Sequence, residues 1–247
     1  MNQAVTTMNK SDPTPVNPRP SRDAVLQADM AAAWEFKREF FWNAFKALDF
    51  NGIAGDYAEF GSHGGKTFRL AWDQIRQREI QRHLWAFDSF RGLPAGATAA
   101  DQHPQWVAGT MATDLARFHE ICRGHGISKD AYTVVEGFYD DTLGAMPPGS
   151  APADIALAYV DCDLHSSART VLNFLRPRLK PGMIIALDDY YCWSKDQISG
   201  ERRAFLEFAD DEPHWHFERY RDYGWAGASF VVERVEPAQS TAQRVAL

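Results

Sequence analysis

The sequence predicts an α/β protein with one mostly parallel sheet of seven strands, helices on both faces and an antiparallel strand at the C-terminal end. Three observations support this prediction. Short apolar segments of strand length alternate with amphipathic segments of helix length, which is the pattern of βαβ units. The last two strand segments are joined by only a few residues, so we expect them to pair antiparallel. The chain has 247 residues, 45% of them hydrophobic, which suffices for one buried core.

The N-terminal half is expected to begin with a flexible arm, residues 1–22. This stretch is rich in Pro, Ser, Thr and Asn and has few large apolar side chains. A helix is predicted over residues 24–48, where four apolar residues recur on one side of a helix: Trp34, Phe41, Phe45 and Leu48. The next segments are a strand at 56–60, a helix at 65–78, a strand at 84–88 and a long loop at 91–111 that is rich in Gly, Ala and Pro.

The C-terminal half is expected to complete the sheet. It contains a helix at 113–123, strands at 132–137 and 155–161, a helix at 166–179, a strand at 183–188, a helix at 199–209, and strands at 214–220 and 227–235. Residues 237–247 are expected to form a flexible tail. The chain shows no internal repeat. We therefore expect a single domain over residues 23–236, with an N-terminal helix at 23–50.

Charge and cysteine content argue against several classes of function. The net charge is −7 and the Lys and Arg residues are scattered among acids, so a nucleic-acid partner is not expected. The three cysteines form no CxxC pair, which predicts neither a disulfide framework nor a zinc site and is typical of the cytoplasm. No apolar run approaches the length of a membrane span, and the N-terminus lacks the pattern of a signal peptide, so no membrane association is expected.

The ends of the first two strands carry residues suited to a nucleotide-like ligand. The first strand runs into GSHGGK (61–66), whose glycines permit a tight turn and a close approach of the backbone to a ligand. Its spacing is not GxGxxG, so the dinucleotide fingerprint is absent. Asp88 ends the second strand, where an acid can accept hydrogen bonds from ribose hydroxyls. The alternatives are a tight turn without a ligand for the glycines, and a helix N-cap or turn Asp for Asp88.

Acidic residues follow the fourth and fifth strands. Asp161 and Asp163 come after the fourth strand, and Asp188 and Asp189 come after the fifth. The carboxyl ends of parallel strands meet at one edge of a sheet, so we expect these side chains to converge. Neighbouring carboxylates stay charged in a confined site only if a cation compensates them, and oxygen ligands suit Mg²⁺. The alternative is that Asp163 and Asp189 cap the elements that follow them.

Taken together, these segments make the chain similar to the macrocin-type O-methyltransferases, enzymes that methylate sugar hydroxyls on macrolides and related natural products. The similarity rests on EFGSHGGKT (59–67), FDSFRGLP (87–94), VEGFYDDTL (135–143) and the stretch from YVDCDLHSS to LRPRLKPGMIIALDDYYCW (159–193). The closing GWAGASFVVE (224–233) is consistent with it. The resemblance covers nearly everything from Asp56 to Glu233, and it implies the Rossmann-like fold of class I methyltransferases.

The resemblance also implies roles for the matching positions. A site for the methyl donor S-adenosylmethionine is implied at Glu59, Gly61, Ser62, Gly65, Asp88, Ser89, Glu136, Gly137, Phe138 and Asp161. A site for magnesium or another divalent cation is implied at Asp161, Asp188 and Asp189. The sequence departs from the family at His63, where a large apolar or aromatic residue is usual, and in the loop 95–111. Both departures concern the identity of the acceptor.

The expected reaction is methyl transfer from the sulfonium of the donor to a hydroxyl of a small-molecule acceptor, glycosylated or aromatic. Holding the oxygen in line with the methyl group supplies much of the rate gain, and a bound metal would lower the pKa of the hydroxyl. Asp161 is the expected proton acceptor, with His165 as an alternative base. Aromatic residues after the fifth strand are candidates for an apolar wall of the acceptor pocket: Tyr190, Tyr191 and Trp193.

Three other functions remain open from the sequence. A catechol-type acceptor would chelate magnesium as sugar diols do. A strand-end carboxylate cluster could instead serve a metal-dependent phosphate-ester enzyme, although no GxxxxGK[ST] loop is present. A non-catalytic binding module is the third alternative, and the complete Asp161, Asp188 and Asp189 set argues against it.

The N-terminal helix is richer in aromatic residues than a single buried face requires. Trp34, Phe40, Phe41 and Trp42 all lie on it. Apolar surface that one core does not use often marks a contact with another chain. We therefore expect a homodimer or a higher homo-oligomer, or a helix that covers the site.

Overall fold

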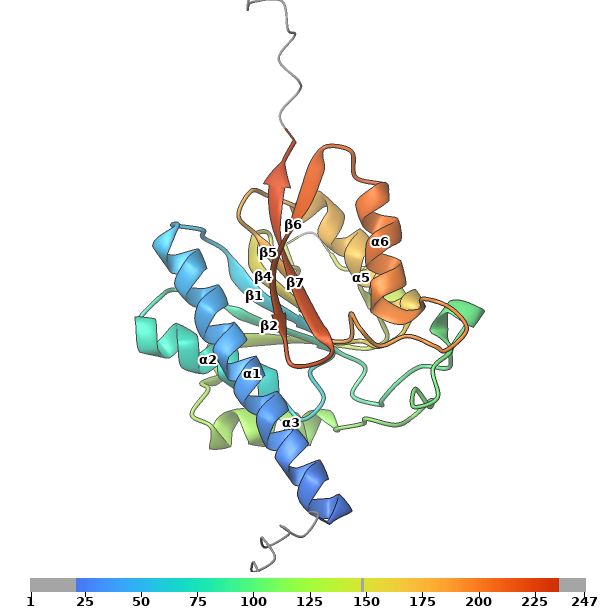
Figure 1. Ribbon diagram of the computed structural model, residues 1–247. Helices are drawn as coiled ribbons and strands as arrows, with labels where there is room; N and C mark the ends of the chain where they lie inside the picture. Colours follow the sequence, from blue (N-terminus) through green and yellow to red (C-terminus); the bar gives the residue numbers. More distant parts are fainter. Residues whose placement is uncertain (1–20, 148, 236–247) are drawn as a thin grey trace, which may run out of the picture.

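The computed structural model describes residues 21–147 and 149–235 (Figure 1). Its strands are β1 (Asp56–Phe60), β2 (Leu84–Asp88), β3 (Tyr132–Glu136), β4 (Ile155–Val160), β5 (Ile184–Leu187), β6 (Trp215–Tyr223) and β7 (Gly227–Arg234). Its helices are α1 (Arg22–Phe50), α2 (Lys66–Arg78), α3 (Leu115–Gly124), α4 (Tyr139–Thr142), α5 (His165–Leu175) and α6 (Gly200–Asp210), with short 3-10 turns η1 (Ala99–Asp101), η2 (Lys129–Ala131) and η3 (Arg176–Arg178). The predicted tail lies outside the described residues, as does the predicted arm except Ser21 and Arg22.

The seven strands form one sheet in the order β3-β2-β1-β4-β5-β7-β6. The first five strands are parallel, and β7 runs antiparallel to both of its neighbours, which confirms the predicted sheet. The chain builds outward from β1 to β3 on one side and from β4 to β5 on the other. The order therefore switches between β1 and β4, and ligands of such sheets bind beyond the strand ends at this point.

Helices cover both faces of the sheet (Figure 1), and a separate apolar core lies under each face. Residues of α1, α2 and α3 belong to one core, and residues of α5 and α6 belong to the other. On α1, Phe41 packs its ring against Tyr57 and Tyr159, with centroids 6.0 and 5.2 Å apart. Burying aromatic side chains of this size contributes strongly to stability. The carboxyl half of α1 is thereby fixed on the sheet.

The helix α1 meets the expectation for its apolar face only in part. Phe41, Phe45 and Leu48 are buried as predicted, whereas Trp34 is half-buried. Phe40 and Phe41 also lie in the core, so these two side chains are not available for the contact with another chain that the sequence suggested. The amino half of the helix is mostly exposed.

Two local features differ from the sequence-based prediction. The helix predicted to reach residue 179 ends at Leu175 and continues as the 3-10 turn η3, because Pro177 has no N–H to donate within an α-helix. The short helix α4 follows β3 and was not predicted. No helix among residues 21–147 and 149–235 is long and apolar enough to cross a membrane.

Candidate active site

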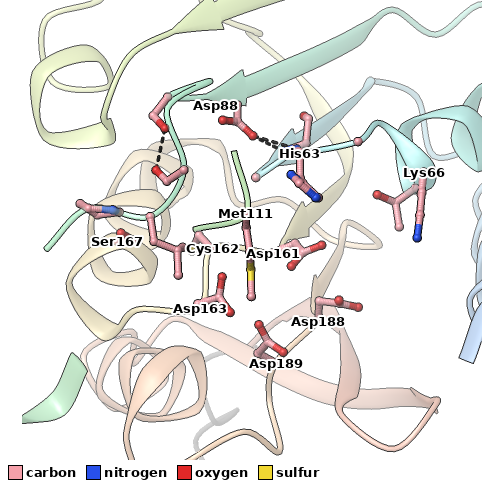
Figure 2. A pocket seen from close by; sticks show the side chains of 18 of the residues that line it. His63, Lys66, Asp88, Met111, Asp161, Cys162, Asp163, Ser167, Asp188 and Asp189 are labelled. Atoms are coloured by element: carbon pink, nitrogen blue, oxygen red, sulfur yellow. Dashed lines mark hydrogen bonds between the residues drawn. The ribbon is translucent and has the colours of Figure 1, made fainter. Parts of the chain in front are cut away.

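A cavity of about 910 Å³ lies beyond the carboxyl ends of the strands around the switch point (Figure 2). Each of the first five strands contributes residues to its wall at or just after its last position. The helix α1 adds Met30, Trp34 and Lys37 from above. The position agrees with the general rule for open α/β sheets.

The Gly-rich loop after β1 packs directly against the loop after β4. Gly61 has φ of +96°, and a Cβ on it would lie 1.7 Å from the carbonyl oxygen of Asp161. Gly64 differs, because a Cβ there would meet no atom within 4 Å. Only the first of these glycines is therefore required by the close approach of the two loops.

Asp88 organises the same loop from the end of β2. Its carboxylate accepts hydrogen bonds from the backbone N–H groups of Ser62 and His63 at 2.8 and 2.9 Å (Figure 2). It also accepts one from the N–H of Phe90 at 2.6 Å. Asp88 thus acts as a loop-shaping Asp, the alternative that the sequence left open, and it lines the cavity as well. Its contact with a ribose remains a prediction.

The structure brings most, but not all, of the predicted donor-binding residues to the cavity. Those that line it are Gly61, Ser62, Asp88, Ser89, Gly137, Phe138 and Asp161. Three do not line it. Gly65 caps the start of α2, and Glu136 is exposed at the end of β3. Glu59 is fully buried beneath the Gly-rich loop.

Glu59 is an ionisable group in an apolar position. The hydroxyl of Tyr57 donates a hydrogen bond to its carboxylate. Burial raises the pKa of Glu59 to about 8, because the charged form loses its hydration. Near neutral pH this side chain is largely protonated and can lie uncharged under the loop.

Four carboxyl groups share one wall of the cavity, as the sequence predicted: Asp161, Asp163, Asp188 and Asp189 (Figure 2). Burial and then the charge of Asp188 raise the pKa of Asp161, and burial followed by the charge of Asp163 raises that of Asp189. The pKa of Asp163 rises to about 7, chiefly through burial and then through the charge of Asp161. Asp163 also adopts φ of +60°, an unusual conformation for a residue other than glycine. The raised pKa values show that negative charge on this wall is unfavourable unless a nearby cation compensates it.

Glu201 holds the two carboxylate-bearing loops together from the first turn of α6. Its side chain is completely buried. One oxygen accepts hydrogen bonds from the N–H groups of Cys162 and Asp163 at 2.8 and 3.3 Å, and the other accepts from the N–H of Asp189 at 2.9 Å. Sequence reasoning missed this residue, because a Glu in the first turn of a helix is common and nothing local shows that it is buried.

Lys37 supplies a positive charge to the carboxylate wall and was also missed by sequence reasoning. Its Nζ lies 2.6 Å from Oδ2 of Asp188, and the hydroxyl of Tyr159 donates to the other oxygen at 2.5 Å. Burial alone would lower the pKa of Lys37, but the charges of Asp188 and Asp161 outweigh it and raise the pKa. The ammonium is therefore charged at every physiological pH.

The donor set of the wall suits magnesium, because it consists of carboxylate oxygens without His or Cys ligands. The carboxyl groups of the wall are not spaced as the ligands of a bound metal ion would be. Within the described part of the chain, no group of three or more His, Cys, Asp or Glu side chains is arranged to hold a metal ion. A metal ion at Asp161, Asp188 and Asp189 remains a prediction.

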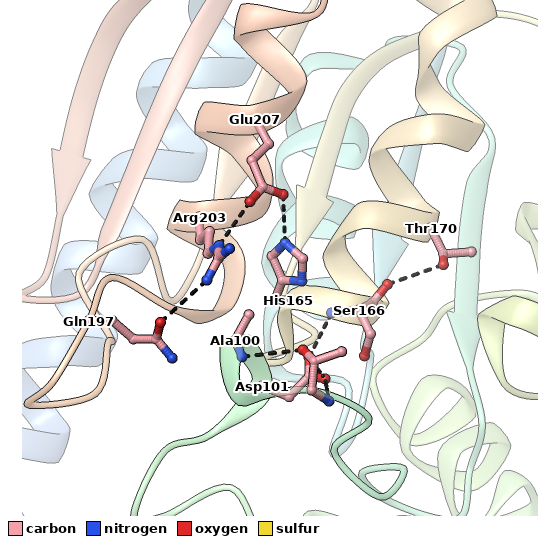
Figure 3. A network of polar contacts seen from close by, with 9 residues as sticks. Ala100, Asp101, His165, Ser166, Thr170, Gln197, Arg203 and Glu207 are labelled. Carbon is pink, nitrogen blue, oxygen red and sulfur yellow. Dashed lines mark hydrogen bonds and ion pairs between the residues drawn. The ribbon is translucent and has the colours of Figure 1, made fainter.

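His165, the alternative base, is not brought to the cavity. It is nearly buried at the start of α5, and its Nε2 lies 2.7 Å from Glu207 of α6 (Figure 3). Glu207 also accepts a hydrogen bond from Arg203 at 2.8 Å. This arrangement gives His165 a role in joining α5 to α6.

The loop 91–111 is anchored onto α5 (Figure 3). Asp101 accepts hydrogen bonds from the N–H of Ser166 at 2.7 Å and from those of Ala97 and Thr98 at 2.9 and 2.8 Å. Residues of this loop also line the cavity, among them Leu93, Pro94 and Met111. The loop is therefore held in a defined position and forms part of the cavity lining.

The aromatic residues after β5 do not line the cavity. Tyr190, Tyr191 and Trp193 instead surround Arg202, whose guanidinium carbon lies 5.2, 5.7 and 5.2 Å from their ring centroids. The expected aromatic acceptor wall is not formed by these residues. Trp34 of α1 is the aromatic residue that α1 contributes to the cavity.

Comparison with known proteins gives a family match over most of the chain. The family model of the macrocin O-methyltransferases (TylF) matches residues 37–210. A 4′-O-methyltransferase of Streptomyces olivaceus that acts on 8-demethyl-8-(2,3-dimethoxy-α-L-rhamnosyl)-tetracenomycin C is 30% identical over 146 residues, 57% of this chain and 54% of that protein. Demethyldecarbamoylnovobiocin O-methyltransferase of Streptomyces niveus is 27% identical over 175 residues, 65% of this chain and 63% of that protein. The matched region thus spans between half and two thirds of the length of these relatives.

Solved structures share the fold. The O-methyltransferase NovP superposes with a TM-score of 0.67 at 20% identity over 79% of each chain. The calicheamicin methyltransferase CalS11 superposes with a TM-score of 0.68 at 20% identity, over 91% of this chain and 99% of the other. At this level of identity the likeness establishes the fold, a class I O-methyltransferase fold.

Proposed function

The chain belongs to the macrocin O-methyltransferase family, and on this premise we propose that it transfers a methyl group from S-adenosylmethionine to a hydroxyl of a small-molecule acceptor. One observation carries the proposal. The Gly-rich loop, Asp88 and the carboxylate wall, which come from different strand ends, line a single cavity. A donor and an acceptor can therefore meet within one cavity.

We propose a sugar hydroxyl of a glycosylated natural product or glycan as the acceptor. The Streptomyces olivaceus relative is named for its action on a rhamnosyl-bearing tetracenomycin, which supports this class. A catechol-type acceptor would also place two adjacent oxygens on the carboxylate wall. Activity toward a panel of glycosides and catechols, measured as S-adenosylhomocysteine released, decides between these two acceptors.

In this proposal the donor lies along the Gly61–Gly64 loop, with its ribose near Asp88 and its adenine near Gly137 and Phe138. The acceptor hydroxyl faces the carboxylate wall. Magnesium, when bound by Asp161, Asp188 and Asp189, would supply positive charge that lowers the pKa of that hydroxyl. Asp161 is our proton acceptor, and Asp163 on the same wall is its rival. His165 has no place in this mechanism, because it contacts Glu207 outside the cavity.

The donor site is tested by titrating the protein with S-adenosylmethionine and S-adenosylhomocysteine in a calorimeter. We expect binding of both compounds by the wild type. Gly61→Ala should weaken that binding by about tenfold or more, because the added Cβ forces the two loops apart. Gly64→Ala is the matched control and should bind normally, since its Cβ meets open space. Absence of binding by the wild type would refute the proposal and favour the phosphate-ester alternative.

The roles of the two candidate bases are separated by Asp161→Asn and Asp163→Asn. Loss of a general base typically lowers turnover by about a hundredfold or more. We expect Asp161→Asn to lose both metal binding and turnover while still binding S-adenosylhomocysteine. If Asp163 is instead the base, Asp163→Asn will keep metal binding and lose turnover, and that result would replace Asp161 in the mechanism.

A further inference from the structure

Lys37 is the cation that balances the carboxylate wall in this structure. Among the described residues it forms the only ion pair with any of the four carboxyl groups: Asp161, Asp163, Asp188 and Asp189. Its Nζ lies 2.6 Å from Oδ2 of Asp188. The ammonium of Lys37 thus supplies the positive charge that stabilises the ionised form of the neighbouring carboxyl groups.

Both oxygens of Asp188 already accept a hydrogen bond. Lys37 holds Oδ2, and the hydroxyl of Tyr159 donates to Oδ1 at 2.5 Å. Tyr159 is fully buried on β4 and packed among the rings of α1, so it has little room to withdraw. Of the two contacts, the one with Lys37 is therefore the one that a cation binding Asp188 can more easily displace.

Lys37 is free to leave that oxygen. Its side chain is 27% exposed, near the middle of α1 and next to the mostly exposed amino half of the helix. The neighbouring residues Glu35, Arg38 and Glu39 are exposed as well. A long, flexible side chain at the rim of a cavity can swing into solvent without disturbing the core.

We propose that Lys37 and a divalent metal ion exclude one another at Asp188, so that Lys37 is the resident counter-ion of the site and metal binding displaces it. This inference rests on the metal site of the proposed function. Two positive charges beside one carboxylate oxygen in a confined cavity repel each other, so each lowers the affinity of the site for the other. Lys37 therefore lowers the affinity for the metal and links metal binding to the amino half of α1, which also lines the cavity through Met30 and Trp34.

The test compares metal binding by the wild type and by Lys37→Met, with no acceptor needed. Mn²⁺ affinity is measured from the loss of the free-ion EPR signal, and Mg²⁺ affinity by competition against Mn²⁺. We expect Lys37→Met to bind Mn²⁺ at least about tenfold more tightly, because the competing charge is gone. Arg38→Met is the matched control. It removes the same charge from the next residue of α1, whose contact is a surface pair with Glu35, and it should change the affinity less than about twofold.

Lys37→Arg keeps the charge and should keep the weak affinity of the wild type. If Lys37→Met binds the metal as tightly as the wild type or more weakly, with an unchanged melting temperature, the inference is overturned. Lys37 would then stabilise the metal site or have no effect on it. An equal rise in Mn²⁺ affinity in Arg38→Met would overturn the inference too, because the rise would then come from the change in overall charge and not from the contact with Asp188. If neither Lys37→Met nor the wild type binds Mn²⁺, the metal site and the inference both fail. The calorimetric titration with S-adenosylhomocysteine then reports separately whether the methyltransferase proposal survives.

Discussion

Glu59 couples protonation to stability beneath the Gly-rich loop. Its pKa of about 8 in the folded protein lies above the ordinary value of 4.5 that applies once the chain unfolds. Between these two pH values the folded state holds a proton that the unfolded state has lost. The stability that this group contributes is therefore fully present below pH 4.5, falls as the pH rises, and is lost above pH 8.

Glu59→Gln should remove this pH dependence, because the amide does not titrate. We expect the variant to gain stability relative to the wild type as the pH rises from 5 to 9, reaching a few kcal/mol at the upper end (about 2–5). Unfolding by guanidinium chloride at several pH values measures it. Glu136→Gln, an exposed carboxyl, is the control and should follow the wild type. Parallel curves for Glu59→Gln and the wild type would contradict the prediction.

Glu201→Ala should be strongly destabilising, because three backbone N–H groups in two loops lose their acceptor. We expect a loss of about 3–5 kcal/mol in the free energy of unfolding. Glu207 lies on the same helix with 47% of its side chain exposed, so Glu207→Ala should cost about 1 kcal/mol or less. Similar losses for the two variants would show that Glu201 does not hold the loops.

At the scale of elements, one buried carboxylate, that of Asp101, holds the long loop 91–111 in place beside the cavity. Asp101 completes a capping box with Thr98 at the turn η1 and accepts a hydrogen bond from the start of α5. These contacts favour an ordered loop at the rim of the cavity, where ordered loops often select the substrate.

Asp101→Ala should free this loop while leaving the rest of the fold intact. We expect faster cleavage within residues 95–111 in limited proteolysis and a loss of about 1–3 kcal/mol in stability. Asp114 caps α3 through the N–H of Arg117, so Asp114→Ala removes a cap of similar kind elsewhere. In Asp114→Ala, the loop 95–111 should be cleaved at the wild-type rate. Equal cleavage rates in all three proteins would mean that Asp101 does not fasten the loop.

The elements could be predicted from the sequence because their signals are local. Short apolar segments marked β1 and β2 at their observed bounds, and the short connection between β6 and β7 predicted antiparallel pairing. The four carboxyl groups were found for the same reason, since each stands at the end of a predicted strand. Lys37 and Glu201 were not found, because their partners lie far along the chain, 151 residues away for Lys37 and up to 39 for Glu201. Only the packing of α1 and α6 on the sheet brings them to the site.

At the scale of the whole molecule, α1 carries exposed apolar side chains that the core does not use. Val25, Phe36 and Phe50 are exposed by 42%, 50% and 81%, and their spacing places them on one side of the helix. Exposed apolar groups aligned in this way often mark a contact between chains. We therefore keep the prediction of a homodimer, but assign the contact to these residues instead of Phe40 and Phe41.

Phe36→Glu should convert such a dimer to monomers, because a buried charge without a partner opposes association. Sedimentation velocity across a range of protein concentrations measures the change. Trp225, in the turn between β6 and β7, is 75% exposed, so Trp225→Glu adds the same charge away from α1 and should leave the dimer unchanged. A wild type that sediments as a monomer at every concentration would refute the contact.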